Sequence, residues 1–211
     1  MVAALSYVRP ESGERRIVIH GVRWRDYVIA REALDAPGVR MTYLKGALEI
    51  MAPSPEHETA KTTSARLIET YAFLARLPLN GYGSTTFRRE AKQRGAEPDE
   101  CWVVGRTLEA AGGFPDIVFE VIETTPLVDK LEVYDGFGIP EVWIFEDGAF
   151  TIHRRKASGG YVLATKSALL PELDFRRIAK LAAMKDQQSA LELLERGMRD
   201  TRKPKRPRRR T

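Results

Sequence analysis

The segment Ile117–Ile122 is apolar on both of its alternating faces, and this feature constrains the fold more than any other in the chain. Such a strand is covered on both sides, as central strands of α/β sheets are. A helical stretch, Leu127–Phe137, follows it between Pro126 and Gly138, and a second strand-like segment, Glu141–Phe145, comes next. Strand, helix and strand in this order form a crossover unit, so we expect an α/β fold with a central mixed sheet flanked by helices.

The rest of the chain adds helices and strands to this unit. Ser54 and Pro55 are typical of a helix start, and apolar residues recur at helical spacing from there through Arg76. Lys45 and Gly46 lie between two apolar segments and predict the turn of an N-terminal hairpin. The other predicted elements are a helix over Trp24–Leu34 and strands over Gly83–Phe87, Glu100–Val104, Phe150–Arg154 and Tyr161–Thr165.

The positive net charge is concentrated at the C-terminus. The last ten residues, RKPKRPRRRT, hold seven of the 34 basic groups, which leaves 27 basic against 29 acidic residues in the remainder. A segment this charged and this poor in apolar residues cannot bury enough surface to fold. We therefore expect one folded domain over residues 14–183, a peripheral helix over 184–200 and a disordered basic tail over 201–211.

Cysteine content and hydropathy indicate the cellular compartment in which the protein is expected. Cys101 is the one cysteine, which excludes an internal disulfide and a zinc site built from several cysteines. No apolar run approaches the ~18 residues that a membrane-spanning helix needs, and the first residues lack the pattern of an export signal. We expect a soluble cytoplasmic protein without a membrane partner.

Two charged residues interrupt the apolar pattern of the crossover unit. Glu120 shares a strand face with Val118 and Ile122, where an uncompensated carboxylate would be costly. Lys130 falls within the apolar helix stripe that includes Tyr134, so it should point toward the sheet. A structural ion pair or an exposed sheet edge would explain Glu120. A stem that lies on apolar surface and carries its ammonium into water would explain Lys130. A buried acid beside an ammonium is also what a metal-assisted hydrolase needs.

Two Pro-Asp pairs place carboxylates at the starts of predicted strands. Asp116 is on the same strand face as Glu120, but four residues separate the two by ~13 Å, so one ion cannot bind both. Asp99 begins a different strand and could lie beside Glu120. Two such carboxylates, with waters and a substrate phosphate, are the ligands that Mg²⁺ prefers. A purely structural aspartate at a turn or strand start is the alternative for Asp99.

Glu49 and His57 are less distinctive. Glu49 faces away from Leu48 and Ile50 in the hairpin and, taken alone, is typical of a solvated strand residue. His57 lies in the first turn of the long helix, where the positive end of the helix dipole should keep the imidazole neutral. A neutral histidine can accept a proton, orient water or bind a metal, and a structural role at the helix start is the alternative.

A basic run, TTFRREAKQRG, precedes Asp99. Such a run is usually a solvated face, and it becomes a phosphate contact surface only where it borders a cleft. In that case nucleic-acid binding should fall steeply with salt. The basic residues of the run are Arg88, Arg89, Lys92 and Arg94.

Four segments together resemble the Uma-two family of restriction-endonuclease-like nucleases, within the PD-(D/E)XK superfamily, over about residues 39–175. They are MTYLKGALEIMAPSPEHE, EPDECWVVG, FPDIVFEVIETTPLVDKLEVYDGFGIPEVWIF and SALLPELDF. The resemblance implies a nuclease core in which Asp99 and Glu120 hold a magnesium-type ion. The superfamily lysine normally stands two residues after the glutamate, at Ile122 here, and Lys130 on the following helix is the implied substitute.

The resemblance also implies roles for three further residues. Glu49 and His57 match recurring family positions at the edge of the site, and Asp116 joins them as a supporting residue that organises waters or the lysine. Many relatives carry a Ser-Pro-Ser-like run after the strand, where this chain has Glu123-Thr124-Thr125-Pro126. The local geometry of the site should differ there, although an acid is retained.

The activity that the resemblance implies is hydrolysis of DNA phosphodiester bonds. Mg²⁺, with Mn²⁺ as a substitute, would polarise the phosphate and activate water, and Lys130 would orient the nucleophile or offset developing charge. Nucleic acid is the expected partner, and a homodimer is compatible with cutting both strands. The alternatives are a catalytically inactive nucleic-acid-binding protein that keeps the fold, and a protein-interaction module whose tail alone binds polyanions.

Overall fold

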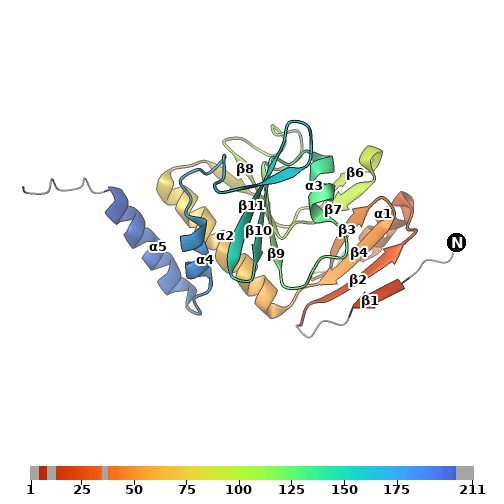
Figure 1. Cartoon of the computed structure of the whole chain (residues 1–211), viewed down its shortest axis with the longest axis horizontal. Helices are drawn as coiled ribbons and strands as arrows, with labels where there is room; N and C mark the ends of the chain where they lie inside the picture. Colours follow the sequence, from red (N-terminus) through yellow and green to blue (C-terminus); the bar gives the residue numbers. More distant parts are fainter. Residues whose placement is uncertain (1–4, 9–12, 35–37, 203–211) are drawn as a thin grey trace, which may run out of the picture.

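The computed structural model describes residues 5–8, 13–34 and 38–202, and these residues form two six-stranded β-sheets with helices packed on them (Figure 1). Neighbouring strands of the first sheet are antiparallel, in the order β1-β2-β4-β3-β7-β6. The predicted hairpin supplies β3 and β4, so it is part of a larger sheet. The strands are β1 (Leu5–Val8), β2 (Arg15–His20), β3 (Arg40–Leu44), β4 (Ala47–Ala52), β6 (Phe87–Arg89) and β7 (Arg94–Ala96).

The second sheet is mixed, as the sequence predicts. Its strand order is β12-β11-β10-β9-β8-β5, in which β9 and β10 run parallel and the other pairs are antiparallel. The helix α3 (Lys130–Phe137) connects the parallel pair and completes the predicted crossover unit. The strands are β5 (Leu79–Gly81), β8 (Glu100–Val104), β9 (Ile117–Ile122), β10 (Glu141–Glu146), β11 (Ala149–Arg155) and β12 (Tyr161–Ala164).

The long helix α2 (Pro55–Ala75) begins where the sequence predicts. Ser54 Oγ accepts a hydrogen bond from the backbone N of His57 at 2.9 Å, and Pro55 takes the first helical position. The cap satisfies one of the donors that every helix start leaves free. The other helices are α1 (Trp24–Ala33), the short 3-10 helix η1 (Glu90–Lys92), α4 (Phe175–Ala182) and α5 (Gln187–Arg202).

The strand β9 is buried on both faces and separates two hydrophobic clusters. Phe119 and Val121 belong to the cluster that α2, α4 and α5 cover. Val118 belongs to the other cluster, together with Val133 of α3. Because side chains alternate along a strand, Glu120 shares the side of Val118 and faces α3. The topology therefore directs this carboxylate toward the helix that follows it in the chain.

The predicted strand over Gly83–Phe87 is wrong. The chain leaves the second sheet after Gly81 and enters the first sheet at Phe87, and the segment between them crosses from one sheet to the other. Gly83 has a φ of 59°, which no extended strand accommodates. The strand β7 was not predicted because three residues are too few for a recognisable alternation.

The C-terminal helix α5 lies in the region of the predicted peripheral helix. It packs against α2 and α4 and buries Ala190 and Leu194 in the larger hydrophobic cluster. Of the predicted tail over 201–211, residues 203–211 lie outside the described residues. No helix in the described part of the chain combines the length and the apolar character needed to cross a membrane.

Candidate active site

Asp99 and Glu120 face each other across two strands of the second sheet. The strands β8 and β9 are antiparallel, with Glu100 opposite Phe119, so the next position in the same register places Asp99 opposite Glu120. Asp99 Oδ2 accepts a hydrogen bond from the backbone N of Val121 at 2.8 Å. Asp99 and Glu120 are 2% and 1% exposed. Two carboxylates from neighbouring strands thus meet in the interior.

Lys130 is the first residue of α3, and its Nζ lies 2.6 Å from Glu120 Oε2. One turn further along the helix, Tyr134 donates its hydroxyl to Glu120 Oε1. The two side chains are four residues apart, so they project from one helix face and hold both oxygens of one carboxylate. Lys130 is 9% exposed, which rules out a stem that carries its ammonium into water. Glu120 is correspondingly not at an exposed sheet edge.

His57 connects Asp99 to a second group of charges. Its Nε2 lies 3.0 Å from Asp99 Oδ1, and its Nδ1 lies 3.0 Å from Glu14 Oε2. Burial opposes the charged imidazole, but the interactions with Asp99 and Glu14 outweigh burial and raise the pKa of His57 to about 9. The expectation of a neutral histidine is therefore wrong, because two adjacent carboxylates dominate over the helix dipole.

Arg16 extends this network to the first sheet. Its Nε donates to Glu14 Oε1 at 2.7 Å and to Thr124 Oγ1 at 3.0 Å, and its Nη1 donates to Glu49 Oε1 at 2.9 Å. Glu49 is 1% exposed, so the expectation of a solvated strand residue is wrong. Glu14 and Arg16 were not predicted as site residues. The available signal was the position of Arg16 on the same strand face as the buried Val18.

Burial and the neighbouring charges set the protonation of the central groups. Burial works against the charged form of Asp99, but the hydrogen bond with His57 prevails and lowers the pKa of Asp99. Burial raises the pKa of Glu120, and Lys130 opposes that rise. For Lys130 burial favours the neutral amine, yet Glu120 and Asp99 raise the pKa of the ammonium. Asp99 and Lys130 are therefore ionised at neutral pH.

The donor chemistry fits a hard divalent cation. The carboxylates outnumber the basic groups in the buried network even when the imidazole is protonated, so the network carries a net negative charge that attracts a cation. Asp99 and Glu120 supply oxygen ligands of the kind that Mg²⁺ prefers, and each oxygen keeps a lone pair beyond the hydrogen bond it accepts. The network consists of the acids Glu14, Glu49, Asp99 and Glu120 and the bases Arg16, His57 and Lys130.

Asp116 lies at the other end of β9 and makes different contacts. Its Oδ1 accepts a hydrogen bond from Arg106 Nη2 at 2.7 Å, and its Oδ2 accepts one from the backbone N of Val104 at 2.9 Å. These contacts fix the end of β8. The described contacts of Asp116 do not include Asp99, Glu120 or Lys130, so the structure does not bring it into the cluster.

The basic run divides into two pairs. Arg89 Nη1 donates to the carbonyl O of Gly136 at 3.1 Å, and Arg94 Nε donates to the carbonyl O of Glu132 at 3.0 Å. Both arginines therefore anchor α3 to the first sheet. Two members of the run are exposed on the surface: Arg88 and Lys92.

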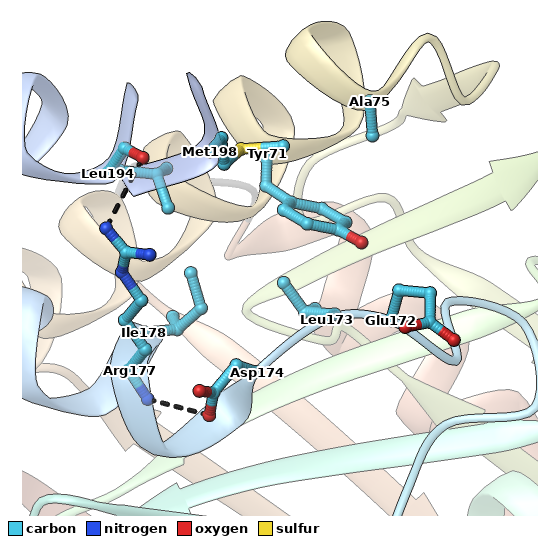
Figure 2. Close-up of a pocket in the computed structure, with 9 residues that line it drawn as sticks. All are labelled: Tyr71, Ala75, Glu172, Leu173, Asp174, Arg177, Ile178, Leu194 and Met198. Carbon is cyan, nitrogen blue, oxygen red and sulfur yellow. Dashed lines mark hydrogen bonds between the residues drawn. The ribbon is translucent and has the colours of Figure 1, made fainter. Parts of the chain in front are cut away.

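A pocket of about 370 Å³ lies away from this cluster, between α2, α4 and α5 (Figure 2). Two of its charged residues, Asp174 and Arg177, make hydrogen bonds within the helices that form it. Asp174 caps α4 by accepting a hydrogen bond from the backbone N of Arg177 at 3.1 Å, and Arg177 Nη2 donates to the carbonyl O of Leu193 at 2.7 Å. None of the residues lining the pocket belongs to the charged network.

The fold is that of an α/β protein of the restriction-endonuclease-like class. The model of the Uma2 family, described as "Putative restriction endonuclease", matches residues 24–181. The chain belongs to the Uma2 family, and this membership supports a nuclease function. No curated protein matches the chain in sequence.

Proposed function

We propose that the protein is a metal-dependent endonuclease that hydrolyses DNA phosphodiester bonds, with Asp99, Glu120 and Lys130 as its catalytic residues. One observation carries the proposal: Asp99 stands opposite Glu120 on the adjacent strand, and Lys130 Nζ lies 2.6 Å from Glu120 Oε2. This is the donor set of a PD-(D/E)XK nuclease in which the lysine has moved from the strand to the following helix.

The roles follow from the positions of the side chains. Asp99 and Glu120 would hold Mg²⁺, or Mn²⁺ in its place. The ion, when bound, polarises the scissile phosphate and lowers the pKa of a bound water. Lys130 presents an ammonium that orients the attacking water or offsets the charge that develops on phosphorus. Tyr134 fixes the second oxygen of Glu120, and His57 fixes Asp99.

The substrate must reach groups that are buried in this structure. Residues 123–129 join β9 to α3 beside the cluster, and they include the exposed Glu123, Thr125 and Asp129. We place the approach of the phosphate along this segment. A displacement of the segment would uncover Lys130 first, because Lys130 directly follows it and is the most exposed of the three catalytic groups.

A catalytically inactive nucleic-acid-binding protein that keeps the fold is the second candidate. The observation in its favour is that all four carboxylate oxygens of Asp99 and Glu120 have a hydrogen-bonding partner within the protein. A buried cluster whose members satisfy one another can serve the structure without holding an ion. The two candidates differ in whether the cluster accepts a metal and cleaves.

Cleavage of supercoiled plasmid DNA separates these candidates. We expect nicking or cutting with Mg²⁺ or Mn²⁺ and none with EDTA, and a single-stranded RNA substrate tests the preference for DNA. Asp99→Asn, Glu120→Gln and Lys130→Met should each reduce cleavage at least ~100-fold, with unchanged far-UV circular dichroism. Sedimentation velocity reports whether the active species is the proposed homodimer.

Glu109→Gln is the matched control, because Glu109 is exposed in a turn and makes no contact with the cluster among the described residues. It should cleave like the wild-type protein. Retained cleavage by Glu120→Gln would show that the site is misplaced. DNA binding without cleavage by the wild-type protein, in any of the divalent ions, would favour the inactive candidate.

A further inference from the structure

We infer that Glu14, His57 and Glu123 form a metal site of their own, separate from the Asp99 and Glu120 pair, for a first-row divalent transition ion. Glu14 directly precedes β2, His57 lies in the first turn of α2, and Glu123 directly follows β9. Each offers one ligand atom, and these atoms all lie within 4.8 Å of one another. The inference does not depend on the proposed nuclease activity.

Two of the three ligand atoms have the spacing of metal ligands. Glu14 Oε2 and His57 Nδ1 are 3.0 Å apart, yet neither of these buried atoms has a hydrogen-bond partner of acceptable geometry. Two neighbouring ligands at ~2.1 Å from an octahedral ion are ~3.0 Å apart, and their lone pairs point to the ion between them. Glu14 Oε2 and His57 Nδ1 therefore lie side by side without a well-directed hydrogen bond, and an ion between them would complete this arrangement.

The second nitrogen of His57 makes the contact that metal-binding histidines require. Its Nε2 lies 3.0 Å from Asp99 Oδ1, where an Nε2–H donates to the carboxylate. A carboxylate that receives this proton fixes the ring orientation, and an ion that binds at Nδ1 would release the second proton of the imidazolium and use the lone pair of Nδ1. The Nδ1 faces Glu14, as the site demands.

The two carboxylates are held in place by groups outside the site. Glu14 Oε1 accepts a hydrogen bond from Arg16 Nε at 2.7 Å, so the opposite oxygen is the one that faces His57. Ser54 Oγ donates to Glu123 Oε2 at 2.6 Å and ties this side chain to the start of α2. Glu123 is exposed, so an ion can enter from solvent on that side.

The ligand set indicates the class of ion. One imidazole nitrogen with two carboxylates suits first-row transition ions, whereas Mg²⁺ prefers oxygen ligands and several waters. Affinity should follow the general order of such ions, with Zn²⁺ binding more tightly than Mn²⁺. The pair Asp99 and Glu120 and the inferred site would then prefer different ions. The imidazole of His57 lies between them, with Nε2 toward Asp99 and Nδ1 toward Glu14.

Titration of the chelator-treated full chain with Mn²⁺, followed by pulsed electron paramagnetic resonance, tests the site. We expect bound Mn²⁺ to show coupling to one histidine nitrogen, and we expect Zn²⁺ to displace it. Glu123→Gln should weaken this binding at least tenfold, and His57→Gln should remove the nitrogen coupling. Glu109→Gln is the control at an exposed glutamate and should bind as the wild-type protein does.

Glu120→Gln distinguishes this inference from the proposed function. That variant should lose DNA cleavage and keep the nitrogen-coupled Mn²⁺, because Glu120 is not a ligand of the inferred site. If His57→Gln does not fold, the exposed Glu123→Gln decides alone. Bound Mn²⁺ that shows no nitrogen coupling in the Glu120→Gln variant, or equal affinity for the nitrogen-coupled Mn²⁺ in Glu123→Gln and the wild-type protein, would overturn the inference, whatever the result of the cleavage assay.

Discussion

Lys130 and Glu120 form a buried ion pair, with 2.6 Å between the ammonium nitrogen and a carboxylate oxygen. Lys130→Met leaves the carboxylate buried without its cation, so we expect the free energy of unfolding to fall by ~3–5 kcal/mol. The double variant Glu120→Gln/Lys130→Met removes both charges and should recover most of that loss. Urea unfolding of the single and double variants measures the coupling. Strictly additive losses would contradict the pairing.

The hydroxyl of Tyr134 stabilises the same carboxylate from the other side. Burial raises the pKa of Glu120 to about 7, so the carboxylate is charged at pH 8. Because a hydrogen bond to a charged group contributes ~1.5–3 kcal/mol, Tyr134→Phe should lower the free energy of unfolding by that amount at pH 8. Tyr161→Phe is the control, since the Tyr161 hydroxyl donates to the neutral carbonyl O of Ile139 at 2.7 Å and should cost only ~0.5–1.5 kcal/mol. Equal losses in urea unfolding would mean that Glu120 is not charged when it accepts from Tyr134.

The buried thiol of Cys101 makes stability depend on pH in alkaline solution. Burial raises the pKa of Cys101 from 9.0 to about 12, so the thiol ionises in the unfolded chain at a lower pH than in the folded protein. The unfolded state then binds fewer protons, and this contribution to the free energy of unfolding falls by up to ~1.4 kcal/mol per pH unit between these values. Below pH 9 the contribution is constant.

Urea unfolding of the wild-type protein and of Cys101→Ala, at intervals from pH 8 to pH 11, isolates this effect. The stability of the wild-type protein should fall more steeply than that of the variant above pH 9. In the native protein at pH 8 the thiol should also be inert toward a disulfide reagent, because Cys101 is 0% exposed. Parallel pH profiles in the two proteins would contradict the shift in pKa.

The exposed members of the basic run should contribute to nucleic-acid binding more than the anchored ones. Arg88→Gln and Lys92→Gln should each reduce the slope of log affinity against log salt concentration by about 1. Arg94→Gln should instead destabilise the protein, since Arg94 Nε binds the carbonyl O of Glu132 at 3.0 Å. Fluorescence anisotropy with duplex DNA measures the slopes.

Truncation after Arg199 removes the basic tail, so the salt dependence of DNA binding by the truncated protein reports the phosphate contacts of the rest of the chain. If the slope of the truncated protein is zero, the folded part of the chain has no phosphate contacts of its own. In that case the unchanged slopes of the Arg88 and Lys92 variants would confirm that the run is a solvated face.

Local patterns were sufficient to predict the central part of the fold and the pair within it. A strand that is apolar on both faces must be central, and Glu120 on that strand must find a partner on the helix that covers it. Lys130 was predicted to point toward the sheet because it interrupts the apolar stripe of that helix. These inferences concern neighbouring elements of one crossover unit, where sequence order determines spatial order.

The remaining site residues depend on contacts between distant segments, which periodicity does not report. Glu14 and Arg16 precede the resembling region, and their partners come from α2, β4 and the segment after β9. The prediction of a neutral His57 is wrong because the carboxylates of Glu14 and Asp99 outweigh the dipole of its own helix. The role of Tyr134 was missed because its ring fits the apolar stripe and conceals a polar end.

Arg16 on β2 and Glu120 on β9 belong to different sheets. Ion pairs connect Arg16 to Asp99 through Glu14 and His57, and Asp99 lies opposite Glu120 on the adjacent strand. A substitution that removes the charge of one of these groups leaves an opposite charge unpaired in the interior. Under the proposed nuclease function, relatives that have lost cleavage activity should therefore lack acids and bases together, in sets whose charges cancel. Related chains that lack such a charge-neutral set of acids and bases would be proteins that have lost the proposed activity and retained the fold.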